Sequence, residues 1–96
     1  MKFGGFDWDS GNLPKCLEHG VSVREIEALF AGDVYIVRDA IVAGERRALG
    51  FGEASGRWIF CVFTWRGDRI RPVSVRYMHD KEIRRYGEEI SRSENR

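Results

Sequence analysis

Hydrophobic positions repeat first at strand spacing and then at helix spacing near the start of the chain. Over residues 3–8, Phe6 and Trp8 would lie on one side of the chain and Asp7 on the other, which suits a short edge strand. A short helix is predicted next, because Asp9 or Ser10 can cap its first turn. It ends at His19, since Gly20 readily adopts the left-handed conformation that stops a helix.

A second helix is the clearest local prediction. Ser22 and Glu25 stand three residues apart, as in a capping box, where each side chain bonds the backbone N–H of the other residue. Apolar residues then recur at intervals of three and four until Gly32, which gives the helix one face to bury. These residues are Val23, Ile26, Leu29 and Phe30.

The middle of the chain predicts strands. Residues 34–37 are a short β-branched and aromatic run, and residues 45–52 alternate apolar and polar positions. Residues 57–65 differ from both, because apolar side chains occupy both faces, and a strand of this kind is covered on both sides. We therefore expect residues 57–65 to lie in the centre of the sheet.

A hairpin and a helix complete the pattern. Residues 66–68 form a tight turn that leads to a strand over residues 70–76. In that strand Pro72 requires an open edge or a bulge, because proline has no N–H to donate. Asp80 can cap a last helix. The apolar positions of this helix are Ile83, Tyr86 and Ile90.

These elements together predict an α+β fold, with two N-terminal helices and a C-terminal helix packed on a small, twisted, mostly antiparallel sheet. A chain of 96 residues supports one core, so residues 1–90 are expected to form a single domain with 91–96 as a frayed tail. Hydrophobic residues make up 43% of the chain and charged residues 32%, a balance typical of a folded protein rather than of a disordered segment.

The sequence also disfavours several classes of protein. No apolar run approaches the roughly 20 residues that span a membrane, and the first residues lack the apolar stretch of a signal peptide, so a cytoplasmic protein is expected. Cys16 and Cys61 are expected to be reduced thiols. With His19 and His79 they do not form two closely spaced ligand pairs, so no metal is predicted, and no glycine-rich loop predicts a nucleotide cofactor.

Charge is distributed unevenly along the chain. The formal net charge is +1, but residues 1–56 carry −3 and residues 57–96 carry +4, so the second half can meet a polyanion. Arginines concentrate on the predicted strands and hairpin turn, and a guanidinium group binds phosphate through two parallel hydrogen bonds. Alternatively, charged edge strands only prevent aggregation. The arginines are Arg46, Arg47, Arg66, Arg69, Arg71 and Arg76.

These residue types suit a ribonuclease that works without metal. Such an enzyme needs a base for the 2′-hydroxyl proton, positive charge at the phosphate and an acid for the leaving oxygen. Glu45 or His19 can be the base, and Tyr86 or His79 can be the acid. The groups that can hold the phosphate are Arg47, Arg71 and Arg76.

The ribonuclease hypothesis sets two geometrical conditions. The guanidinium groups must converge on one face of the sheet, and Arg71 and Arg76 share a face only if Pro72 introduces a bulge. The same groups must also be available to phosphate, rather than each being held by a neighbouring carboxylate.

Short segments in order along nearly the whole chain form a recognisable set. They are residues 6–9 and 19–22, Glu45, Arg47 and Gly52, residues 62–64, 66–67, 70–71 and 74–76 of the hairpin, and Glu82 and Tyr86. This ordered set resembles the BrnT toxin family. Two positions depart from the family pattern, because Glu18 stands where a lysine is usual and Pro72 where an aliphatic residue is usual.

The resemblance implies a RelE-like fold and the toxin of a type II toxin-antitoxin pair. Such a toxin is an endoribonuclease that inhibits translation. A BrnA-like antitoxin with a ribbon-helix-helix region neutralises it, and the pair binds operator DNA through the antitoxin. The alternative is a binding module of the same fold without catalysis.

The resemblance also implies which residues form the active surface. It assigns Arg47, Arg71, Arg76 and Tyr86 to that surface, with Glu45 and His19 as further candidates. We expect additional RNA contacts from Arg66, Arg69, His79 and Lys81.

Overall fold

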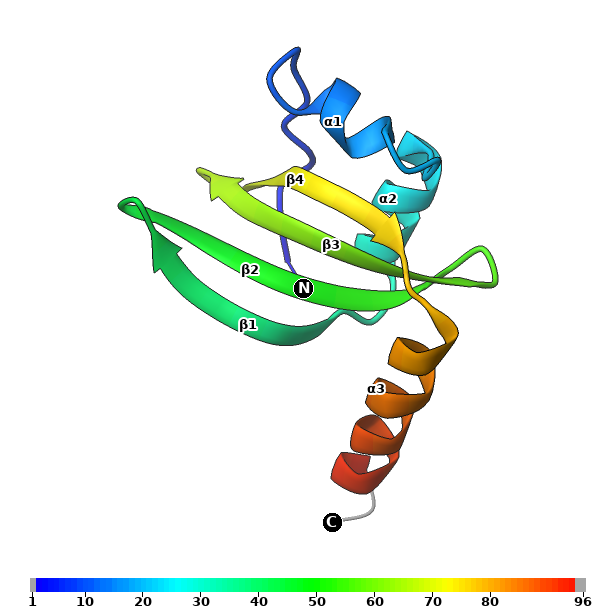
Figure 1. The fold of residues 1–96 in the computed structure, drawn as a ribbon. Helices are drawn as coiled ribbons and strands as arrows, with labels where there is room; N and C mark the ends of the chain where they lie inside the picture. The colour runs from blue at the N-terminus through cyan, green and yellow to red at the C-terminus, as the bar shows by residue number, and fades with distance from the viewer. Residues whose placement is uncertain (1, 95–96) are drawn as a thin grey trace.

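The structure is a computed structural model that describes residues 2–94, with side chains to residue 90. Two helices, α1 (Leu13–Leu17) and α2 (Val23–Ala31), precede the strands, and α3 (Asp80–Glu94) follows them. The antiparallel sheet has the order β1-β2-β3-β4. The strands are β1 (Tyr35–Val42), β2 (Glu45–Ala54), β3 (Arg57–Arg66) and β4 (Arg69–Tyr77). This architecture confirms the predicted α+β class (Figure 1).

The capping box of α2 is confirmed. The Ser22 hydroxyl accepts a hydrogen bond from the Glu25 backbone N–H at 3.1 Å, and the Ser22 N–H donates to the Glu25 carboxylate at 3.1 Å. The helix ends at Gly32 as predicted and buries one face, formed by Ile26, Leu29 and Phe30. This face lies against the sheet and belongs to the larger of two hydrophobic clusters, called the larger core below. Its other buried members include Ile59, Cys61 and Phe63 of β3 and Ile70 and Val75 of β4.

Strand β3 has apolar residues on both faces, as predicted, and lies inside the sheet. Ile59, Cys61 and Phe63 are fully buried on the face that α2 covers. Phe60, on the other face, belongs to a smaller cluster with residues of β2 and α3. Those neighbours are Phe51, Ile83, Tyr86 and Ile90. Cys16 and Cys61 are free thiols in the larger core, and burial raises the pKa of each.

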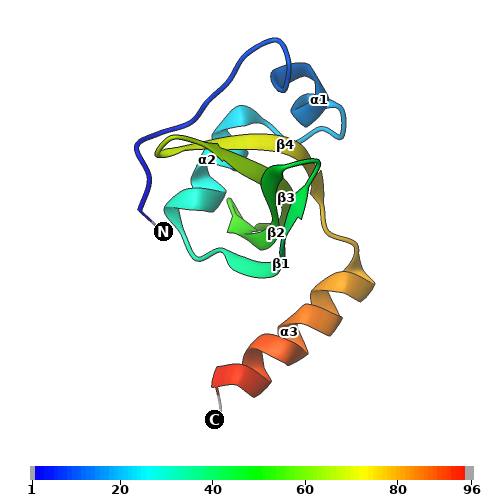
Figure 2. The same ribbon diagram turned by 90° about the vertical axis from the view of Figure 1, so that its left-hand side faces the viewer.

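Helix α3 leaves the end of β4 and projects away from the sheet, so that its last turns stand clear of the other helices (Figures 1 and 2). Its start differs from the prediction, because Asp80 is already inside the helix. The Glu82 carboxylate instead accepts the backbone N–H of His79 at 2.9 Å. Glu82 thus satisfies a backbone donor that the helix itself leaves without a partner.

Three further predictions about the elements were wrong. Residues 3–8 form no strand, although Phe6 makes an isolated parallel bridge with Ile70. Helix α1 begins after Asn12 rather than after Asp9 or Ser10, and ends at Leu17 rather than His19. Strand β1 continues beyond residue 37 to Val42, because its second half pairs with β2 across a two-residue turn.

The expected frayed tail over residues 91–96 stays a prediction. Helix α3 includes Glu94, and residues 95–96 lie outside the described part of the chain. Within the described part, no helix combines the length and apolar character that a membrane crossing requires. The predicted RelE-like character of the fold also stays a prediction.

Substitution of Gly52 by alanine tests the contact between α2 and β2. A Cβ at Gly52 would lie 2.5 Å from the carbonyl oxygen of Asp33 and 2.8 Å from Cδ1 of Leu29. We expect Gly52→Ala to lower the free energy of unfolding by about 1–3 kcal/mol in urea denaturation, because the helix must move off the sheet. Gly87→Ala is the control, since a Cβ there meets nothing within 4 Å. It should raise stability by about 0.5–1 kcal/mol. Equal stability of Gly52→Ala and the wild type would contradict the packing described.

Candidate active site

The face of the sheet turned away from α2, called the open face below, carries the candidate residues. Arg71 pairs with Thr64 and Arg76 with Phe60, and residues directly opposite on neighbouring strands share a face. Thr64 and Phe60 are four residues apart, so both arginines lie on the open face. The register shifts because Val62 pairs with Ser74 while Phe63 pairs with Pro72. Val73 is the extra residue of this bulge, so Arg71 and Arg76 share one face of the sheet, as the ribonuclease hypothesis requires, although they line two separate hollows described below.

Strand β2 adds two residues to the same face. Leu49 pairs with Val62, so Glu45 and Arg47 lie on the open face as well. With Arg66 of β3 and α1 they surround a polar hollow of about 270 Å³. The side chains of this hollow that carry a charge are Lys15, Glu45, Arg47, Arg66 and Arg71.

Glu45 lies between two arginines in the polar hollow. Its carboxylate accepts a hydrogen bond from Arg66 Nη1 at 2.5 Å and from Arg47 Nε at 3.3 Å. The bond from Arg66, and then that from Arg47, hold the pKa of Glu45 below its usual value. Glu45 is therefore ionised at neutral pH and can accept a proton, but these bonds weaken it as a base.

Arg71 is held by the segment that precedes α1. Its two terminal nitrogens donate to the Asp9 carboxylate at 3.0 Å each, and Asp7 lies 3.6 Å away. Buried Asn12 fixes this segment to β4, because its side-chain nitrogen donates to the carbonyl oxygens of Pro72 at 2.8 Å and Asp7 at 3.0 Å. Neither Asp9 nor Asn12 was among the site residues predicted from the sequence. The Asp-Trp-Asp spacing was the available signal for the acidic pair.

A second hollow, of about 180 Å³, lies beside Arg76 on the open face. The terminal nitrogens of Arg76 donate to the two oxygens of Glu82 at 2.8 Å each. These bonds, more than the backbone N–H of His79, lower the pKa of Glu82 to about 2. Tyr86 lines the hollow from α3 and packs edge-on against Phe60, with the ring centroids 5.6 Å apart.

The second condition of the ribonuclease hypothesis is not met in the free protein. Arg71 and Arg76 each form a two-bond pair with a carboxylate, and Glu45 binds Arg47 and Arg66. All four pairs are at least partly exposed, and exposed ion pairs of this kind contribute little to stability. Two more cations of the open face, Lys15 and Arg38, have no carboxylate within 4 Å among the described residues. The open face keeps an excess of positive charge.

The remaining candidates lie outside the two hollows. Arg69 is exposed and pairs in register with Arg66 at the end of the hairpin. His79 and Lys81 are exposed at the start of α3, and His19 is exposed after α1. His19, His79 and Lys81 line none of the hollows described on the open face. Their roles stay predictions.

Arg46 differs from the other strand arginines because it points to the opposite face. Its guanidinium group lies 4.1 Å from the centre of the Trp65 ring and forms an ion pair with Asp39 at 2.6 Å. Trp65 itself packs against the larger core. Arg46 is therefore a structural arginine and a useful control for the site. Across residues 2–94, no cluster of three histidine, cysteine or acidic side chains has a geometry that could hold a metal ion.

Comparison with known proteins gives one match. Residues 8–82, which include the open face and the start of α3, match the family described as the ribonuclease toxin BrnT of a type II toxin-antitoxin system. Neither the curated proteins nor the solved structures compared with the chain include a match. The family match covers all four strands and includes Asp9 and Glu82, the carboxylates that form two-bond pairs with Arg71 and Arg76. The chain belongs to the BrnT family of ribonuclease toxins.

Proposed function

We propose that this chain is a metal-independent endoribonuclease that inhibits translation in the cytoplasm. A BrnA-like ribbon-helix-helix antitoxin neutralises it, and the complex binds operator DNA through the antitoxin. The observation that carries the enzymatic part is the convergence of Arg47, Arg66, Arg71 and Arg76 on the open face. Family membership supports the toxin and antitoxin part.

The reaction follows from the charges of the open face. A base removes the proton of the 2′-hydroxyl, the 2′-oxygen forms a bond to phosphorus, and the bond to the 5′-oxygen breaks as an acid protonates that oxygen. In this proposal Arg71 and Arg76 bind the phosphate and stabilise its added negative charge. Glu45 is the candidate base in the polar hollow, and Tyr86 is the candidate acid beside Arg76.

RNA binding on this face requires an exchange of partners. The carboxylates of Asp9 and Glu82 occupy the positions on Arg71 and Arg76 that a phosphate would take. A phosphodiester offers the same two-oxygen geometry as a carboxylate, so it can replace them one for one. The exchange leaves Asp9 and Glu82 exposed to solvent, where a free carboxylate is well hydrated.

One observation favours a second function, a binding module of the same fold without catalysis. Every arginine of the two hollows already has a carboxylate partner, and a protein-binding surface needs no free guanidinium group. The two functions differ in one measurable respect, because only the enzyme leaves new RNA ends.

Substitution of the open-face arginines tests the enzyme. Purified protein incubated with total RNA in EDTA should produce fragments with 5′-hydroxyl ends. Arg71→Ala and Arg76→Ala should each reduce the cleavage rate by about 10²–10³, the usual loss when one group that stabilises the developing charge is removed. Arg46→Ala, on the opposite face, should cleave within about twofold of the wild type.

Two results would contradict the enzymatic proposal. Intact RNA at micromolar wild-type protein would favour the binding module, and an equal loss of activity in Arg46→Ala would mean that the open face is not the site. Cleavage that occurs only when EDTA is left out would contradict metal independence but not the enzymatic activity itself.

Inhibition of translation has its own test. Added to a cell-free translation reaction, the wild-type protein should stop incorporation of labelled amino acid, whereas Arg76→Ala should leave it near the level without protein. Parallel digestion of the purified messenger RNA, with and without ribosomes, separates free cleavage from ribosome-dependent cleavage. Unimpaired synthesis with the wild-type protein would refute this part.

The Arg76–Glu82 pair predicts a dependence of stability on pH. Folding lowers the pKa of Glu82 from 4.5 to about 2, so the pair stabilises the fold fully above pH 4.5 and loses this effect as the pH falls toward 2. Glu82→Gln should therefore be less stable than the wild type by about 1 kcal/mol at pH 7, a value that allows for screening by solvent, and by less at pH 3.

Urea denaturation at the two pH values measures the difference. Glu89→Gln is the matched control on α3, because Glu89 approaches Arg85 only to 3.9 Å, and it should change stability little at either pH. A Glu82→Gln deficit that is equal at pH 3 and pH 7 would show that the ion pair is not its cause.

A further inference from the structure

The two edges of the sheet are protected differently. Along β4, residues 4–7 form backbone hydrogen bonds with the strand, from Gly4 N–H to Asp68 at 2.8 Å, from Ile70 N–H to Gly5 at 3.0 Å and from Asp7 N–H to Ile70 at 2.9 Å. Strand β1 is the other edge, and within residues 2–94 nothing pairs with its outer side. An uncovered edge presents a row of N–H and C=O groups to which a further strand can bind.

The side chains of β1 do not discourage such pairing. Exposed edge strands of soluble proteins usually carry charges or proline, yet four large apolar residues of β1 are exposed. Its two charged residues are Arg38 and Asp39, and Arg46 already binds Asp39. The exposed apolar residues are Ile36, Val37, Ile41 and Val42, with exposed fractions of 47%, 39%, 69% and 48%.

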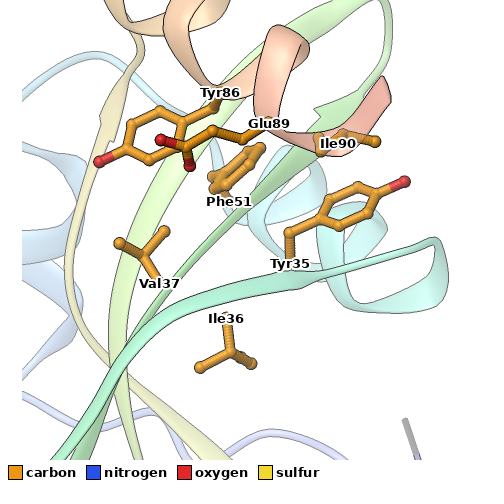
Figure 3. A pocket seen from close by; sticks show the side chains of 7 residues that line it. All are labelled: Tyr35, Ile36, Val37, Phe51, Tyr86, Glu89 and Ile90. Atoms are coloured by element: carbon orange, nitrogen blue, oxygen red, sulfur yellow. The ribbon is translucent and has the colours of Figure 1, made fainter. Parts of the chain in front are cut away.

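A groove of about 280 Å³ runs beside β1, between this strand and α3. Figure 3 shows the rings of Tyr35, Phe51 and Tyr86 with Val37 and Ile90 around it, while Ile36 points to the other side of the strand. A strand added outside β1 would direct alternate side chains toward this side of the sheet. An apolar side chain of that strand can therefore enter the groove.

The groove is continuous with the open face. Tyr86 lines both the groove and the hollow beside Arg76, so a segment seated in the groove lies next to the candidate site. Toward the other end of β1, Arg38 and Arg47 line a further hollow of about 260 Å³. Because Arg38 has no carboxylate partner among the described residues, acidic side chains of a binding partner would complement this end of the strand.

We propose that the antitoxin binds this edge: an extended antitoxin segment adds to β1 as a fifth strand, one apolar side chain fills the groove, and acidic side chains meet Arg38 and Arg47. The identity of the partner as an antitoxin rests on the proposed function. The position explains neutralisation, because a segment in the groove covers Tyr86 and restricts access of RNA to Arg76. A second copy of the chain is the competing occupant.

Direct binding measurements test this proposal. The probe is the purified antitoxin encoded beside this chain, titrated against wild-type protein, Val37→Glu and Ile41→Glu. We expect both variants to weaken binding by tenfold or more, because Val37→Glu places a carboxylate in the groove and Ile41→Glu removes the most exposed apolar side chain of the edge from contact with the added strand. Leu17→Glu is the matched control, since Leu17 is 41% exposed on α1, away from β1, and it should bind within twofold of the wild type.

Hydrogen exchange in the complex tests the backbone part. Amides of β1 should exchange more slowly when the antitoxin is bound, whereas those of β4, at the opposite edge of the sheet, should change little. Thermal melting of each variant, measured by circular dichroism, confirms that it is folded before its affinity is compared.

Three outcomes would overturn the proposal. The first is that both β1 variants bind the antitoxin with wild-type affinity, and the second is that amide hydrogen exchange in β1 does not change when the antitoxin binds. The third is a wild-type dimer that becomes monomeric in Ile41→Glu while antitoxin affinity stays the same, which would assign the edge to a second copy. Because binding is measured without RNA, a protein that fails to cleave RNA but loses antitoxin binding in Val37→Glu would refute the enzyme and support the docking surface.

Discussion

Burial of β3 on both faces is the constraint on which the rest of the structure depends. Ile59, Cys61 and Phe63 are fully buried beneath α2, and Phe60 is buried on the opposite side against residues of α3. A shift of one residue in the register would exchange the two faces of the strand and expose both sets of side chains. The two clusters therefore fix how β2 and β4 pair with β3, and with them the direction of every arginine on those strands.

The bulge at Val73 places the two arginines of the candidate site, Arg71 and Arg76, on one face of the sheet. Without it, Arg71 and Arg76 would point to opposite faces, since they stand five positions apart in the strand. Pro72 lies on the outermost strand of the sheet next to this bulge, where the lack of an N–H disrupts the pairing least. The extra residue places both guanidinium groups on the open face while Ile70 and Val75 still contribute to the larger core.

Local signals in the sequence predicted the elements that depend on local interactions. The capping box of α2 and the two-sided pattern of β3 were read correctly, because the residues that stabilise them are neighbours or share one strand. The segment over residues 3–8 and the start of α1 were predicted wrongly. Their structure depends on contacts with β4, such as the bond from Asn12 to Pro72, 60 residues away, which no local pattern reveals.

The same distinction applies to the candidate site. Alternation along the strands predicted that Glu45 and Arg47 share a face, and Pro72 indicated the possible bulge that the structure contains. The carboxylates were not predicted, because Asp9 reaches Arg71 across 62 residues of sequence. Glu82 was identified only as a residue of the family pattern, and its bond to Arg76 depends on the angle at which α3 leaves β4.

The ion pairs with carboxylates occupy the arginines of the site, but they also keep those arginines in place. Four guanidinium groups on one small face repel one another, and Asp9, Glu45 and Glu82 reduce that repulsion while holding each arginine in one orientation. Because ion pairs at the surface contribute little to stability, a phosphodiester meets arginines that are already oriented and loses little free energy in displacing the carboxylate. Acidic side chains of a protein partner can take part in the same exchange. RNA and antitoxin would then compete for Arg47, and the more extensive contact along β1 would favour the antitoxin.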